Sequence, residues 1–271
     1  MLAELHRKGG CLCQPAREGA LHCPLIIRPT SEDVITDHLV QVMRTINPRW
    51  WLPDFLNSAL GAPAVHPQQF RNLRIEPWVN KPTFPRDLLH WDEGSTQVDI
   101  VITWENPATT VYVEMKYWSE LSARTAENRG EHGFASDQLA RNIRVGLLEC
   151  GYFEVPQLFE FSKRDFLQLV ISPGGNQKLV QKYRDPSEVR QAIPYSHLIK
   201  KLPKLPFVGE LNYFDLMNLF QLHRRMFSRA ERVVADQFVK YLAMKSTQNP
   251  RRKNLGKSSF EQLPLVEDSP G

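Results

Sequence analysis

Three charged residues stand at spacings that allow them to act together: Asp99, followed by Glu114 and Lys116 two residues apart. Two carboxylates can hold a hard divalent cation such as Mg²⁺, which prefers oxygen ligands and keeps several of its waters. Such a cation lowers the pKa of a bound water and offsets charge on a phosphate under attack. A neighbouring lysine can orient that water. These residue types therefore indicate metal-assisted hydrolysis of a phosphate ester.

The surrounding residues predict a β-hairpin over 97–116. Apolar and polar side chains alternate in both halves with the period of two that is typical of strands. Pro107 lies between the halves and predicts a turn, because it cannot continue a ladder. Glu114 and Lys116 then point to the same side, roughly 6–7 Å apart, with Asp99 on the neighbouring strand. The alternative explanation is an ordinary surface hairpin with charges on its wet face.

Four further elements are expected around the hairpin. They are a helix from about 30 to 46, a strand at 73–79, a helix at 135–149 and a strand at 165–172. The order along the chain is therefore αβββαβ, obtained from hydrophobic periodicity alone. A helical segment from Tyr213 to Met244 is expected after it.

The motif resembles that of the PD-(D/E)XK nuclease superfamily, in which an acid on one strand is followed by acid-x-lysine on the next. Here these positions are Asp99 and then Glu114-Met115-Lys116, with Val98 in the place of the proline. The element order is similar to the nuclease core as well. The resemblance covers about residues 30–172. It implies a restriction-endonuclease-like α/β fold, with a mixed central sheet flanked by helices, and a metal-dependent nuclease acting on DNA.

The resemblance also implies roles for individual residues. Asp99 and Glu114 would bind Mg²⁺ or Mn²⁺, with the Met115 carbonyl as a further ligand. Lys116 would orient the attacking water or help to deprotonate it.

Two other residues stand where the superfamily places supporting groups. Glu32 lies on the apolar side of the first expected helix, where a third acid would reach the metal. The alternative is a partner for the helix dipole, worth about 0.3–1 kcal/mol. Gln138 lies near the start of the helix after the hairpin, where a polar residue faces the cleavage site. An exposed glutamine without a role is the alternative.

Basic residues outnumber acids from 162 to 204, and such a run can contact phosphates independently of sequence. We expect nucleic acid, in particular DNA, as the partner. A solvated face is the alternative, and a homodimer is one arrangement for cutting both strands. The candidate contacts are Lys163, Arg164, Lys178, Lys182 and Arg184.

Composition allows a real core, since 42% of the 271 residues are hydrophobic and the net charge is +4. The sequence contains no run of 18 apolar residues, so no membrane span is predicted. The first ten residues lack the apolar core of a signal peptide. A cytoplasmic protein without a membrane partner is expected. Cys11, Cys13 and Cys23 match no common zinc spacing, so a leader with reduced thiols is favoured over a zinc site.

The expected organisation has four parts. An irregular leader spans 1–29, the nuclease-like domain 30–205, a helical segment packed on it 206–245, and a polar, disordered tail 246–271. No base-reading pattern such as a helix-turn-helix accompanies the motif. The alternative function is a member of the same fold that binds nucleic acid or protein without cutting.

Overall fold

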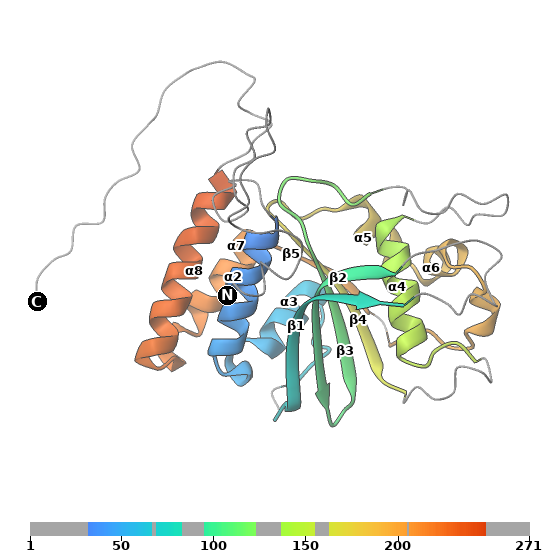
Figure 1. Ribbon diagram of the computed structural model, residues 1–271, viewed down its shortest axis with the longest axis horizontal. Helices are drawn as coiled ribbons and strands as arrows, with labels where there is room; N and C mark the ends of the chain where they lie inside the picture. Colours follow the sequence, from blue (N-terminus) through green and yellow to red (C-terminus); the bar gives the residue numbers. More distant parts are fainter. Residues whose placement is uncertain are drawn as a thin grey trace, which may run out of the picture.

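The computed structural model describes residues 32–66, 69–82, 95–122, 137–154, 163–204 and 206–247 (Figure 1). The expected leader, nearly all of the expected tail, and the cysteines at 11, 13 and 23 lie outside these ranges. None of the helices within them is long and apolar enough to cross a membrane.

The described strands form one five-stranded mixed sheet in the order β1-β2-β3-β4-β5. The first two pairings are antiparallel, whereas β4 pairs in parallel with β3 and with β5. The α/β class is therefore confirmed. The strand bounds are Arg71–Lys81 (β1), Thr96–Glu105 (β2), Thr109–Met115 (β3), Asp165–Ser172 (β4) and Val208–Asn212 (β5).

The hairpin expected at 97–116 is formed by β2 and β3, which pair in antiparallel register with Ile102 opposite Val111. Pro107 lies in the connection between them. Val111 and Val113 point to one face and are fully buried, because helices cover both sides of the sheet. Tyr112 and Glu114 point to the other face, which is the face that α4 covers.

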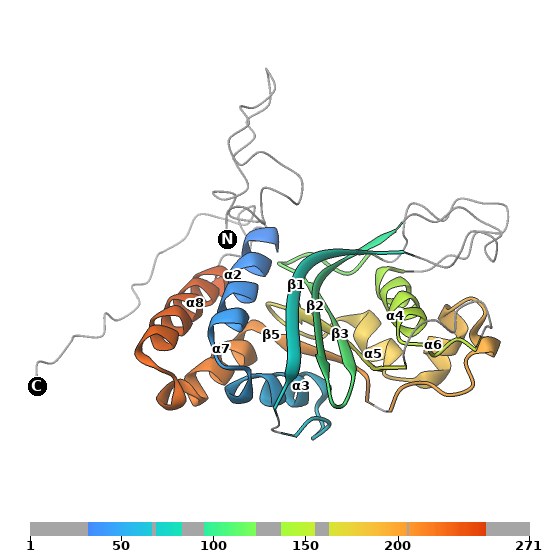
Figure 2. The ribbon, with the colours of Figure 1, turned by 60° about the horizontal axis from the view of Figure 1, so that its bottom comes forward.

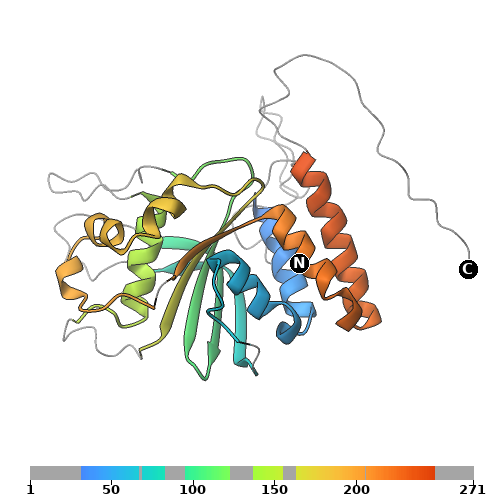
Figure 3. The same ribbon diagram turned by 180° about the vertical axis from the view of Figure 1, so that it is seen from behind.

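Helices pack on both faces of the sheet. Figures 1 and 3 show α4, α5 and α6 together on one side and α2, α3, α7 and α8 on the other. The helices span Glu32–Thr45 (α2), Leu52–Leu60 (α3), Gln138–Glu149 (α4), Lys178–Tyr183 (α5), Pro186–Ala192 (α6), Tyr213–Leu222 (α7) and Arg229–Thr247 (α8).

Helix α4 packs closely against the sheet at Gly146. A Cβ atom at Gly146 would lie only 2.1 Å from the ring of Phe166 on β4, so this position has no room for a side chain. The helix begins after Asp137, whose carboxylate accepts a hydrogen bond from the Ala140 N–H at 2.8 Å and so caps the first turn. Together these residues fix where the polar side chains of α4 meet β3.

The β1–β2 ribbon bends over α4 at its far end (Figure 2). Side-chain contacts with α4 stabilise the bend. The Arg141 guanidinium on α4 donates to the Ser95 carbonyl at 3.2 Å, and the Lys81 ammonium lies 2.5 Å from the Glu149 carboxylate. The start of β2 therefore touches the same helix that faces β3.

The C-terminal part differs from the expected single helical segment. Strand β5 belongs to the sheet, so the expected boundary between 205 and 206 does not separate a helical unit from the sheet domain. The helical segment expected from Tyr213 to Met244 is helical over most of its length and contains two separate helices, α7 and α8. Ser228 and Glu231 start α8 with a capping box, in which the Ser228 N–H donates to the Glu231 carboxylate at 2.7 Å and the Glu231 N–H donates to the Ser228 hydroxyl oxygen at 3.3 Å.

Candidate active site

Asp99 and Glu114 lie at neighbouring positions on β2 and β3. Ile100 pairs with Val113, and Asp99 and Glu114 are the next residues beyond this pair on their strands, on the same face of the sheet by alternation. The Asp99 carboxylate also accepts a hydrogen bond from the Met115 N–H at 2.8 Å. The two acids that the sequence singled out therefore come from adjacent strands and lie side by side.

Glu114 is buried, with 2% of its surface exposed, and its carboxylate has three donors. The Lys116 ammonium lies 2.9 Å from Oε1, and the Gln138 amide donates to the same oxygen at 2.5 Å. The Asn142 amide donates to Oε2 at 3.1 Å. Because burying a carboxylate without partners is costly, these donors are what allow a charged group at this position.

Glu32 joins the site through the chain that follows β3. Its carboxylate accepts hydrogen bonds from the Tyr117 N–H at 2.9 Å and from the Ser119 hydroxyl. Its other oxygen lies 3.9 Å from the Lys116 ammonium. Glu32 thus holds the segment after Lys116 and adds negative charge beside it.

The backbone of Lys116 is fixed on two sides. Its N–H donates to the Ile171 carbonyl of β4 at 2.8 Å, and its own carbonyl accepts from the Tyr213 hydroxyl of α7 at 2.8 Å. The Lys116 side chain is 9% exposed, so the ammonium is held in place and shielded from most solvent.

The environment shifts the pKa of both charged groups. Burial raises the pKa of Glu114, and the nearby charge of Glu32 adds to this, outweighing the opposite effects of Lys116 and Asn142. Burial alone would lower the pKa of Lys116, but the carboxylates around it, Glu114 first, raise it instead. The pKa shifts of these two groups are therefore linked, since the charge of each one acts on the other.

The oxygen atoms present here suit a hard divalent cation. A carboxylate offers about four lone-pair positions, and the three donors at Glu114 leave one for a further partner. The described ranges contain no cluster of three or more His, Cys, Asp or Glu side chains placed for a metal ion. A cation here would therefore take its protein ligands from Asp99, Glu114 and the Met115 carbonyl, with water completing its shell.

Three residues of this site were not singled out from the sequence: Asn142, Thr96 and Tyr213. Asn142 follows Gln138 by one helical turn, and this i, i+4 spacing is the one signal that was visible in advance. The Thr96 hydroxyl donates to the Asn142 amide oxygen at 3.0 Å. Thr96 and Tyr213 come from the bent end of the ribbon and from α7, and neither position follows from a local pattern.

The candidate phosphate contacts separate into two groups. Lys178, Lys182 and Arg184 are exposed on or just after α5. The adjacent Tyr183 donates to the Asp137 carboxylate, which joins α5 to the start of α4. These three basic residues are therefore on the same side of the sheet as Gln138.

Arg164 makes structural contacts within the sheet. Its expected role as a phosphate contact does not fit these surroundings. Its guanidinium lies 2.7 Å from the Glu105 carboxylate and donates to the Trp104 carbonyl at 2.8 Å. It precedes β4, which runs parallel to β3, so it lies at the end of the sheet opposite Lys116. Lys163 is exposed beside it, at that same end.

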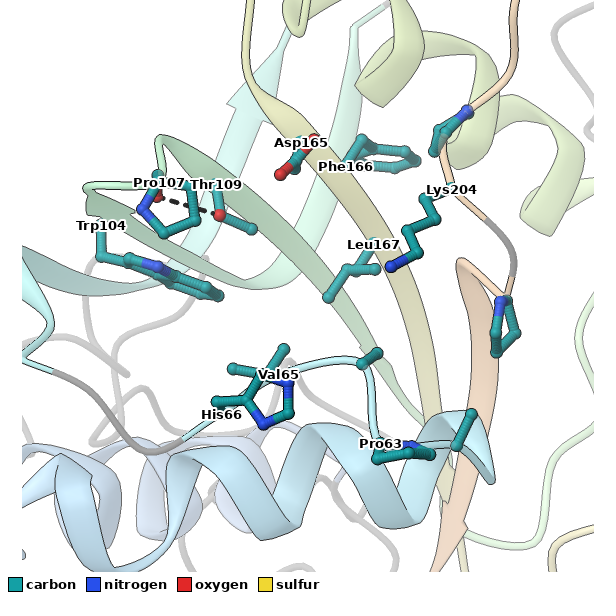
Figure 4. A pocket seen from close by; sticks show the side chains of 14 residues that line it. Pro63, Val65, His66, Trp104, Pro107, Thr109, Asp165, Phe166, Leu167 and Lys204 are labelled. Atoms are coloured by element: carbon teal, nitrogen blue, oxygen red, sulfur yellow. Dashed lines mark hydrogen bonds between the residues drawn. The ribbon is translucent and has the colours of Figure 1, made fainter.

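A cavity of about 390 Å³ opens at this opposite end, near the turn of the hairpin (Figure 4). Its walls are mostly apolar and include Trp104, Pro107 and Leu167. His66 and Lys204 reach it from the loops around it. The cavity and the Glu114 cluster share strand β3 but lie at its two ends.

Comparisons with protein-family models, with curated proteins and with solved structures gave no match.

Proposed function

We propose that this chain is a metal-dependent nuclease of the PD-(D/E)XK type, with a restriction-endonuclease-like fold, that hydrolyses phosphodiester bonds in DNA. The observation that carries the proposal is the ion pair of Lys116 and Glu114, 2.9 Å apart at the end of β3, with Asp99 alongside. Paired acids with a buried lysine have a direct chemical use in phosphate ester hydrolysis. The element order and the exposed basic residues of α5 support the same function.

In this proposal Asp99, Glu114 and the Met115 carbonyl hold Mg²⁺ or Mn²⁺. When bound, the cation supplies an acidified water and offsets charge on the phosphate. Lys116 donates a hydrogen bond to the attacking water or to a phosphate oxygen, and its raised pKa suits it to donate rather than to remove a proton. Gln138 and Glu32 keep Glu114 and Lys116 in place.

The test is cleavage of labelled duplex DNA, single-stranded DNA and RNA in Mg²⁺ or Mn²⁺. We expect wild-type protein to cut at least the duplex, and Asp99→Ala and Lys116→Ala each to lose about 10²–10⁴-fold in rate, as is typical when a charge-stabilising or proton-transfer group is removed. Lys240→Ala, an exposed lysine of α8, is the matched control and should cut normally. Cleavage that survives both site substitutions would place the chemistry elsewhere.

The alternative, a binding protein of the same fold, predicts a different result in that experiment. Such a protein would retain labelled nucleic acid in a binding assay and leave it intact in either metal. The burial of Glu114 gives a reason to prefer the enzyme, because a carboxylate without a chemical use would be costly to keep in this position.

A further inference from the structure

A short relay of hydrogen bonds connects β2 to the Glu114 carboxylate through α4. The Thr96 hydroxyl donates to Asn142 Oδ1 at 3.0 Å, and Asn142 Nδ2 donates to Glu114 Oε2 at 3.1 Å. All three residues are buried, with exposures of 7%, 1% and 2% in that order. The relay is thus shielded from water, and each member depends on the next.

The Glu114 carboxylate selects the orientation of the Asn142 amide, and the Thr96 hydroxyl holds the amide in that orientation by donating to its oxygen. An amide has a donor end and an acceptor end, and a carboxylate accepts only. With Oδ1 engaged by Thr96, Nδ2 is turned toward the carboxylate. The flipped amide would set Oδ1 against Oε2 and leave the carboxylate without that donor, which is unfavourable in a buried place.

The bend of the β1–β2 ribbon is what brings Thr96 to α4. The contacts of Ser95 and Lys81 with α4 hold the bend on either side. Asp99 lies three residues after Thr96 on the same strand. One strand therefore carries the first acid of the site and the group that orients the partner of the second acid.

We propose that Thr96 and Asn142 are positioning residues that hold the Glu114 carboxylate in one orientation, with Oε2 restrained by Asn142, for a divalent cation shared with Asp99. The inference rests on the proposed function, because it assumes that this site takes such a cation. Groups that orient metal ligands in this way commonly change metal affinity by about 10–100-fold when they are removed.

The measurement is Mn²⁺ affinity of the full chain by isothermal titration calorimetry, with metal-free thermal unfolding recorded for each variant. We expect Thr96→Val to weaken Mn²⁺ binding about 10-fold and Asn142→Ala at least as much. Thr96→Ser keeps the hydroxyl and should bind like wild type. Thr103→Val, the same change on the same strand at a partly exposed position, is the control and should also bind like wild type.

The double variant separates orientation from general stability. If Thr96 acts through Asn142, adding Thr96→Val to Asn142→Ala should weaken Mn²⁺ binding no further, although the melting temperature falls again. Additive losses, or wild-type affinity in Thr96→Val, would overturn the inference while leaving the nuclease proposal standing. If wild-type protein binds no Mn²⁺, both proposals fail. Should Thr96→Val not fold, Thr96→Ala, which also removes the hydroxyl, replaces it in the same comparison.

Discussion

The two ends of strand β3 have different chemical surroundings. At its carboxyl end, Glu114 and Lys116 are charged, buried and surrounded by donors and acceptors. At its amino end, Thr109 borders an apolar cavity of about 390 Å³ next to Trp104 (Figure 4). Glu114 lies five residues after Thr109, so the change takes place over about 17 Å of strand.

The two ends of β3 differ in whether their buried polar atoms have hydrogen-bond partners. At the carboxyl end both oxygens of Glu114 have donors, and these donors come from α4 and from the chain after β3. At the amino end the Trp104 indole N–H is buried without an acceptor among the described residues. A buried charge without a partner costs far more free energy than one lost hydrogen bond. The hydrogen-bond partners of Glu114 are therefore more important for stability than an acceptor for the Trp104 N–H.

The largest expected effect comes from Trp104→Ala at the cavity end. Trp104 is 1% exposed and packs edge-on against Phe70 with ring centroids 5.5 Å apart. Removing it should lower the free energy of unfolding by about 3–5 kcal/mol, as measured by urea unfolding. Mn²⁺ affinity of the folded variant should stay within about twofold of wild type, because distant sites act independently. Loss of Mn²⁺ binding in folded Trp104→Ala would show that the two ends are coupled.

A smaller effect is expected from Arg164→Ala, also at the cavity end. Its guanidinium links Glu105, the Trp104 carbonyl and the Thr110 hydroxyl, so its loss should cost about 2–3 kcal/mol in urea unfolding. Affinity for labelled DNA should not change. The exposed neighbour Lys163→Ala is the control for stability and should unfold like wild type. Weakened DNA binding in Arg164→Ala with unchanged stability would restore its role as a phosphate contact.

The sequence predicted the parts of the fold that depend on local patterns. The β2–β3 hairpin follows from alternation and from the turn at Pro107. The β4 bounds 165–172 follow from the run DFLQLVIS, which Pro173-Gly174-Gly175 ends. All of these are properties of neighbouring residues. Strand β5 was not expected, because its five residues include only Val208 and Leu211 as large apolar side chains. Its identity as a strand comes from pairing with β4, and no local pattern contains that information.

The candidate site divides in the same way. Asp99, Glu114 and Lys116 could be predicted to meet because one hairpin carries all three. Thr96 and Tyr213 could not, because their places depend on the bend of a ribbon and on a helix residue 97 positions from Lys116 in the chain. The candidate phosphate contacts were predicted as one group because they lie close together in the sequence. The direction of β4 then set Arg164 and the α5 residues at different ends of the sheet.

The last prediction concerns how the burial of Glu114, at the carboxyl end of β3, makes the stability of the metal-free protein depend on pH. The pKa of Glu114 is raised in the folded state, so the folded protein binds this proton more tightly than the unfolded chain does. Its contribution to stability is therefore present below the ordinary glutamate pKa and is lost as the pH rises through the folded pKa. Lys116 has no part in this window, because its pKa is raised from an already high value.

Glu114→Gln removes this titration, so we expect the stability of wild type relative to Glu114→Gln to fall as the pH rises above the ordinary glutamate pKa. One proton limits the slope to about 1.4 kcal/mol per pH unit. The measurement is urea unfolding of both proteins in a chelator across this range, with the exposed Glu76→Gln of β1 as the control that should show no such trend. A relative stability that rises with pH would mean that Lys116 and the two amides overcome the cost of burial. The carboxyl end of β3 would then be a structural ion pair like that of Arg164, and the contrast between the two ends would disappear.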